Sequence, residues 1–260
     1  MEWFVFLLSL LASVFGAFCG VGGGVVVKPL LDAFQVGTVA QISFLSGCMV
    51  LAMSCYSIGR AFLKKGGRES FRPETLLAVG AAAGGVLGKF AFSRLQGVLP
   101  DPERAGGYQA LCMMALVAAA ALYMLFQEKA RTRRVKSAAG KLSIGFSLGA
   151  MSGFLGIGGG PVNLMVLHYF FSMETRRAVD DSLYIILLSQ LASLLTAALS
   201  HSIPEVSPAV LFTMTAGGLL GGVLGKRLEK GIREETHRRL FFGFMAVILG
   251  VNAWNTAHFF

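Results

Sequence analysis

The sequence predicts an all-α polytopic membrane protein made of two inverted repeats, each a glycine-tipped helical hairpin plus three transmembrane helices. Composition is the first observation behind this prediction. The 260-residue chain is 55% hydrophobic and only 14% charged, whereas a soluble domain carries about 25% charged residues. The second observation is a series of long uncharged windows, and the third is a pair of glycine motifs that each occur twice.

The uncharged windows are the candidate membrane segments, because most of them reach the roughly 20 residues that cross a hydrocarbon core. They are 3–27, 33–59, 75–88, 105–127, 142–173, 182–204, 206–225 and 240–260. The net charge of +9 would also suit a nucleic-acid binder. However, the basic residues lie in short connections between the windows, so we expect no nucleic-acid partner. The alternating pattern of a membrane barrel is absent, and the first residues lack the positive start of a cleaved signal peptide.

Internal repetition divides the chain into halves. The motif FCGVGGG at 18–24 returns as FLGIGGG at 154–160, an offset of 136 residues. The motif at 80–89 returns at 217–226, an offset of 137, with seven of ten positions identical. Two motifs at nearly one offset indicate a duplication. We therefore predict a first repeat over 1–127, a cytoplasmic basic linker over 128–141, and a second repeat over 142–260.

The distribution of Lys and Arg predicts that the two halves are inverted, because positive residues stay cytoplasmic. The connection 64–74 holds four Lys or Arg residues, and its counterpart 201–208 holds none. The next pair reverses this bias, since 94–107 holds two and 226–239 holds six. Equivalent connections thus carry opposite bias.

Inversion requires an odd number of crossings in each half, so one of the four apolar segments must enter and leave on one side. The first segment of each half is the candidate, because the glycine triplet splits it into pieces too short for a full crossing. The predicted order is a hairpin over 3–36 and helices 38–63, 75–97 and 106–127, then a hairpin over 142–171 and helices 178–200, 209–228 and 239–257. With both termini outside, 19 of the 23 Lys and Arg residues become cytoplasmic. Fully crossing hairpins remain the alternative.

The glycine-rich tips are the first candidate site. Glycine breaks in corresponding positions of inverted repeats point to a transporter site near the midplane. Each tip precedes a helix N-terminus, whose free amides and dipole favour an anion, and glycine lets the backbone approach a ligand. The candidate substrate-binding residues are Gly22, Gly23, Gly24, Gly158, Gly159 and Gly160. The alternative is that these glycines only permit tight turns and helix contact.

Polar side chains after each hairpin form a second candidate set. Hydroxyls and amides at these positions could donate to an anion, or could serve hydrogen bonding between helices. The candidates are Gln41, Ser43, Asn163 and Ser182, with Ser46, Ser189 and Gln190 beside them. Asp180 and Asp181 are proton-coupling candidates because carboxylates near membrane depth are functional by default. The alternative is a capping role at a helix start, with Arg176 and Arg177 as partners.

The remaining features favour packing over chemistry. Gly80, Gly84 and Gly88 are spaced by four, as are Gly217, Gly221 and Gly225, and such stripes let helices approach closely. Lys89 and Lys226 end the stripes, where snorkelling to the interface is expected and attraction of anions is the alternative. The scattered Cys and His residues form no metal, redox or catalytic pattern. We expect no cofactor, no metal and no enzymatic activity.

Three sets of residues form a recognisable pattern: GVGGG with Pro29-Leu30 in the first half, GIGGG with Pro161 in the second, and Ala178-Val179 with Ser182. In this pattern the chain resembles the sulfite exporter TauE/SafE family of bacterial membrane permeases. It departs from that pattern at Met165, the counterpart of Pro29, and at Asp180-Asp181, where such families tend to show Gly-Thr. The resemblance implies a multi-pass inner-membrane protein that transports sulfur-containing anions.

Together these observations predict a secondary transporter for a small anion of the sulfite, thiosulfate or organosulfonate class. The anion would bind between the two tips, and one repeat would rock against the other to export it. No ATPase motif is present, so the energy must come from an ion gradient, from the anion's own gradient and the membrane potential, or from a partner protein. The alternatives are an importer of the same anions and a membrane scaffold that transports nothing. The expected partners are the anion and the lipid bilayer, and a homo-oligomer is left open.

Overall fold

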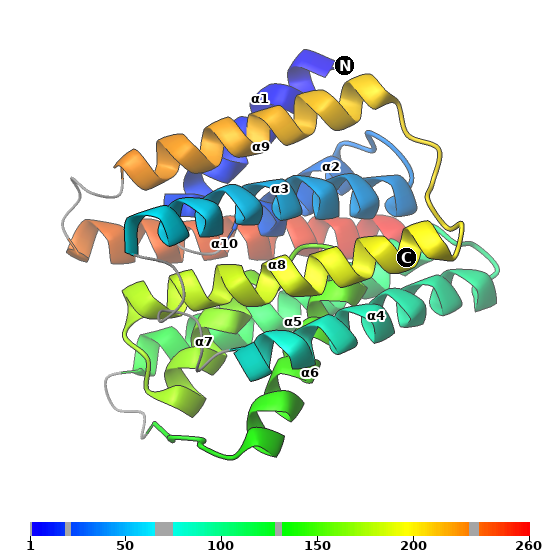
Figure 1. Ribbon diagram of the computed structural model, residues 1–260. Coiled ribbons are helices and arrows are strands. Elements are labelled where there is room, and N and C mark those ends of the chain that lie inside the picture. The colour runs from blue at the N-terminus through cyan, green and yellow to red at the C-terminus, as the bar shows by residue number, and fades with distance from the viewer. Residues whose placement is uncertain (1, 19–21, 66–74, 128–131, 229–233) are drawn as a thin grey trace.

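The computed structural model describes residues 2–18, 22–65, 75–127, 132–228 and 234–260, and every regular element among them is an α-helix (Figure 1). Residues 19–21 of the first tip, and parts of the basic connections at 66–74, 128–131 and 229–233, lie outside the described residues. The helices are α1 (Glu2–Phe18), α2 (Gly24–Ala33), α3 (Val39–Lys65), α4 (Thr75–Val98), α5 (Arg104–Phe126), α6 (Ala138–Leu155), α7 (Gly160–Phe171), α8 (Thr175–Leu199), α9 (Pro208–Leu228) and α10 (Glu234–Phe259).

Six of the described helices are long and apolar enough to cross a membrane, judged by length and composition. The apolar stretches are Val39–Arg60, Thr75–Val98, Arg104–Phe126, Arg177–Leu199, Pro208–Leu228 and Arg239–Phe259. They coincide with the six crossings predicted from the uncharged windows, three in each half. The prediction of an all-helical, multi-pass membrane protein is therefore confirmed, whereas the inverted orientation of the halves stays a prediction.

The other four helices form two hairpins. In the second hairpin, the backbone N–H of Val135 donates to the carbonyl of Phe170 at 2.9 Å, which joins the segment before α6 to the end of α7. In the first hairpin, the ring centres of Phe4 and Phe34 lie 5.2 Å apart. This contact joins the start of α1 to the residue that follows α2. Each hairpin therefore begins and ends at one place. With 10 residues in α2 and 12 in α7, these arms are too short to cross a bilayer.

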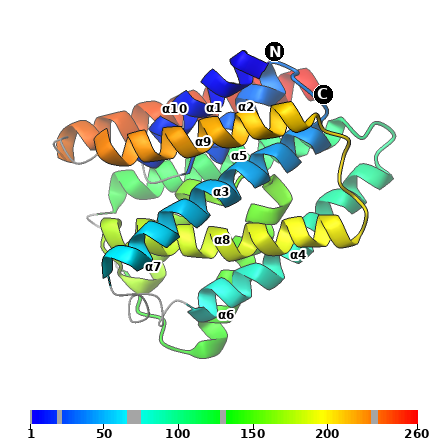
Figure 2. The same ribbon diagram turned by 45° about the horizontal axis from the view of Figure 1, so that its top comes forward.

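Each glycine stripe packs against the hairpin of the other half. A Cβ atom on Gly84 of α4 would lie under 3.0 Å from the Phe146 backbone of α6, and one on Gly221 of α9 equally close to the Leu10 carbonyl oxygen of α1. These two contacts join positions that the repeat offsets relate. The pairs α1–α9 and α4–α6 lie on opposite sides of the bundle, with α3 and α8 between them (Figures 1 and 2). The glycine stripes thus serve close packing, as predicted.

Candidate functional site

The second hairpin tip is a strained turn that only glycine accommodates readily. α6 ends at Leu155, and Gly156 follows in the left-handed conformation with φ of 68°. Gly158 and Gly159 also have positive φ, at 83° and 84°, and α7 then begins at Gly160. A Cβ atom disfavours this backbone region, so the glycine-rich motif is what allows α6 and α7 to reverse direction in so few residues.

The described part of the first tip is built differently. Gly22 has φ of 81°, and its N–H donates to the Gly16 carbonyl at 3.1 Å. Gly23 has a helical φ of −65° and forms the N-cap of α2. A Cβ atom on Gly23 would lie 2.9 Å from the Cα atom of Ser13. Gly23 is therefore needed for the close approach of α2 to α1, and its backbone requires no positive φ.

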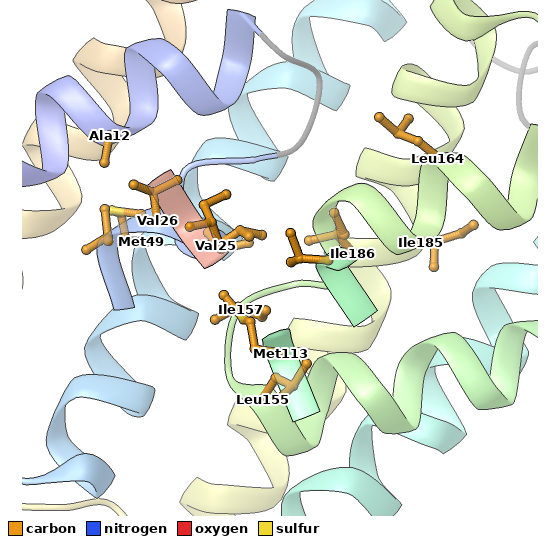
Figure 3. Close-up of a cluster of buried hydrophobic side chains, with 14 of the residues drawn as sticks. Ala12, Val25, Val26, Met49, Met113, Leu155, Ile157, Leu164, Ile185 and Ile186 are labelled. Atoms are coloured by element: carbon orange, nitrogen blue, oxygen red, sulfur yellow. The ribbon is translucent and has the colours of Figure 1, made fainter. Parts of the chain in front are cut away.

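The two tips contact each other through apolar groups. A Cβ atom on Gly24 would lie 2.8 Å from the Ile157 carbonyl oxygen, so the two backbones are in direct contact. Figure 3 shows Val25, Ile157 and Ile186 gathered between the hairpins, and all three side chains are buried. Val and Ile side chains offer an anion no hydrogen bonds. The polar groups that can form hydrogen bonds lie on the flanks of the tips.

One flank of the second tip brings three predicted residues together. Asn163 Nδ2 of α7 donates to Ser182 Oγ of α8 at 3.2 Å, and each residue is 1% exposed. A Cβ atom on Gly159 would lie 2.7 Å from Asn163 Oδ1. That oxygen has no hydrogen-bond partner within the described residues, and Asn163 borders a small cavity whose other lining groups are mostly apolar. This flank holds a buried amide beside the N-terminus of α7.

A second flank of this tip is formed by α3. Ser46 Oγ donates to the Gly156 carbonyl at 3.0 Å, and a Cβ atom on Gly156 would lie 3.1 Å from Ser43 Cβ. Ser43 is 6% exposed, and its hydroxyl has no hydrogen-bond partner in the part of the chain that is described. Residues of the first half thus hold the tip of the second half, and one of them keeps an unused hydroxyl there.

Gln41 is placed apart from this set by its hydrogen bonds. Its Oε1 accepts from the Thr38 N–H at 2.9 Å, at the beginning of α3. Its Nε2 donates to the Glu205 carbonyl at 2.6 Å, in the connection between α8 and α9. Both ends of the amide are thus engaged where these segments meet, and a role for Gln41 in binding stays a prediction.

The two acidic candidates lie in the second turn of α8, which begins at Thr175 after its N-cap Glu174. Asp181 is 2% exposed, and its Oδ2 lies 3.5 Å from Nε of Arg177, whose side chain is largely exposed. Asp180 is partly buried beside it. The pairing with Arg177 matches the structural alternative for these residues, and proton coupling stays a prediction.

A buried ion pair in α2 was missed by the sequence reasoning. Lys28 Nζ lies 2.6 Å from Asp32 Oδ2, and the two side chains are 4% and 6% exposed. Asp32 Oδ1 has no hydrogen-bond partner among the described residues. The available signal was two opposite charges spaced by four within an otherwise apolar hairpin arm. The offset of 136 places Leu164 and His168 at the equivalent positions, so this pair belongs to the first hairpin alone.

Six candidate crossings around two broken, glycine-tipped hairpins define a multi-pass membrane protein with the architecture of a transporter. The chain belongs to the sulfite exporter TauE/SafE family, whose family model matches residues 5–252. It is also 24% identical over 251 residues to a protein of Bacillus subtilis (strain 168) named "Probable membrane transporter protein YunE", with 88% of this chain and 89% of that protein covered. No solved structure matches the chain. The resemblance noted in the sequence is thereby confirmed, and the protein is a membrane transporter of this family.

Proposed function

We propose that the protein is a secondary transporter that exports a small sulfur-containing anion, of the sulfite, thiosulfate or organosulfonate class, across a bacterial inner membrane. The observation that carries this proposal is the second tip. There the backbone breaks at Gly158-Gly159-Gly160 beside the buried amide of Asn163 and the hydroxyl of Ser182. Irregular backbone at membrane depth is tolerated where it is buried or lines a cavity, and a helix N-terminus with nearby donors favours an anion.

Alternating access follows from the way the halves are packed. The pairs α1–α9 and α4–α6 each combine helices of both halves at backbone contact, so each pair is suited to move as a unit. Rocking one pair against the other about α3 and α8 would open the tips to one side at a time. In this proposal the halves are inverted, both termini are periplasmic, and the segment 128–141 is cytoplasmic.

Asp180 and Asp181 are the proposed proton-coupling residues. Asp181 is the better placed of the two, because it is 2% exposed and lies one residue before Ser182. Protonation would release its attraction to Arg177, and the proton gradient would thereby act on the helix that carries a substrate group. An acidic side chain at membrane depth is a common element of such coupling.

Transport into proteoliposomes tests the proposal. The purified protein is reconstituted, and uptake of radiolabelled sulfite, thiosulfate and isethionate is followed under three conditions: a pH gradient, a membrane potential, and neither. We expect saturable uptake of at least one anion, reduced by Gly159→Ala, which places a Cβ atom at a positive φ beside Asn163. Gly243→Ala is the control, since a Cβ atom there meets nothing within 4 Å. Uptake no greater than in protein-free liposomes for all three anions would refute the proposal.

A further inference from the structure

A second pocket, which unlike the first has a largely polar lining, lies beside the same tip, where α3, α4, α6 and α8 meet. Its polar lining consists of Ser43, Lys89, Gln190 and Ser193, together with the backbone of Gly156. No carboxylate is among its lining residues. Two of these side chains come from the first half and two from the second, so the pocket exists only because the halves are packed together.

Lys89 does not behave as a snorkelling lysine in this structure. It lies nine residues before the end of α4 at Val98, which is about 13 Å of helix. Its ammonium group stands 5.5 Å from the centre of the Phe92 ring, and Phe92 is 1% exposed. The charge is therefore directed toward a buried aromatic side chain that lines the pocket, where it gains a cation–π interaction.

Among the described residues, the charge of Lys89 also has no counter-ion. Lys89 is partly buried, and no described carboxylate lies within ion-pair distance of it, whereas the fully buried Lys28 is paired with Asp32 at 2.6 Å. A cation at membrane depth is expensive unless a partner compensates it. An anion in the pocket would supply that compensation, as the Asp32 carboxylate does for Lys28.

The neighbouring groups suit the oxygens of an oxyanion. Ser43 is 94% buried, lines the pocket, and has a hydroxyl without a partner in the described chain. Gln190 Nε2 donates to Ser152 Oγ at 3.2 Å, and Ser193 adds a hydroxyl on the next turn of α8. Hydrogen bonds from such donors to a charged acceptor are stronger than neutral ones.

We propose that this pocket is the binding subsite for the transported anion, a small sulfur oxyanion whose charge Lys89 compensates and whose oxygens accept hydrogen bonds from Ser43 and Ser193. This inference rests on the proposed function, and it places the anion on the flank of the second tip. Because the pocket joins the α4–α6 pair to α3 and α8, movement of that pair against α3 and α8 would change the affinity of the subsite. Such a change is what an alternating-access transporter needs.

Two variants and one matched control test the subsite. Lys89→Gln removes the charge, and Ser43→Ala removes an unpartnered hydroxyl without loss of a protein hydrogen bond. Arg94→Gln is the control, because it removes a positive charge from an exposed position of the same helix. Binding of sodium sulfite and sodium thiosulfate to purified protein is measured by thermal shift at constant ionic strength, with sodium chloride as the reference salt.

We expect Lys89→Gln to weaken the affinity roughly 10- to 100-fold and Ser43→Ala roughly 3- to 10-fold, with Arg94→Gln unchanged. Parental affinity in both pocket variants would overturn the inference, as would a parent protein that binds neither salt at millimolar concentration. If Lys89→Gln fails to elute as a monodisperse protein, Ser43→Ala decides alone. If the parent protein shows flux and Lys89→Gln has the same flux and affinity, the subsite is refuted and the proposed function stands. If binding requires Lys89 but the parent protein shows no flux, the subsite stands and the proposed transport function is refuted.

Discussion

Replacing Gly84 by alanine measures how much the protein depends on backbone contact between α4 and α6. A Cβ atom at this position would lie 2.7 Å from the Ala150 nitrogen and 2.8 Å from the Phe146 carbonyl carbon, whereas ordinary contact begins at 3.4 Å. These neighbours are backbone atoms and cannot rotate away. The two helices must therefore separate by more than half an ångström, and a gap of 0.5–1 Å loses roughly a quarter to a half of the attraction at each contact.

The expected loss is about 1–3 kcal/mol, typical of an overpacked interior. Gly250→Ala is the matched control, since it lies within α10 and a Cβ atom there meets nothing within 4 Å. That change should stabilise the helix by about 1 kcal/mol, because glycine is a poor helix former. The two variants should thus differ by about 2–4 kcal/mol, or roughly 4–16 °C in melting temperature at 2–4 °C per kcal/mol.

Thermal melting followed by size-exclusion chromatography of the detergent-purified proteins provides the measurement. The corresponding change on the other side of the bundle, Gly221→Ala, should behave like Gly84→Ala because it meets the Leu10 carbonyl in the same way. If Gly84→Ala melts at or above the temperature of Gly250→Ala and elutes normally, α4 and α6 are not in backbone contact, and the packing argument is wrong.

Three further predictions concern topology, the buried ion pair and coupling. In a cysteine-free background, Ser202→Cys should react with an impermeant reagent in intact cells and Ser137→Cys only after permeabilisation; reaction of both from one side would contradict the inverted halves. Lys28→Met should lower the free energy of unfolding by about 3–5 kcal/mol, because it leaves Asp32 as an uncompensated buried charge, and a second change, Asp32→Leu, should restore most of the melting temperature. Asp181→Asn should abolish the stimulation of flux by a pH gradient, while exchange of the labelled anion persists. If the response to the pH gradient is unaltered, the coupling role of Asp181 is refuted and its role is the structural pairing with Arg177.

The long helices were predictable because the insertion of a helix into a membrane depends on residues that are adjacent in the sequence. A run of about 20 uncharged residues is sufficient for a crossing, and all six candidate crossings follow from such runs. The glycine triplets likewise marked the starts of α2 and α7 to within one residue, since glycine is the residue that permits the required turns. Part of the site was predictable for the same reason, because Asn163 and Ser182 follow the second tip closely in sequence.

The sequence by itself thus determined the helical class, the broken hairpins and the polar residues near the second tip. Each of these features depends on residues that lie close together in the chain. The tertiary structure alone decided which groups share a pocket. Lys89 ends a glycine stripe and has the sequence context of a snorkelling residue, yet its ammonium group faces Phe92 within a pocket lined by Ser43 and Gln190. These groups come from three helices separated by up to about 150 residues. Only the packing of one half against the other brings them together, because no local pattern in the sequence relates residues so far apart in the chain.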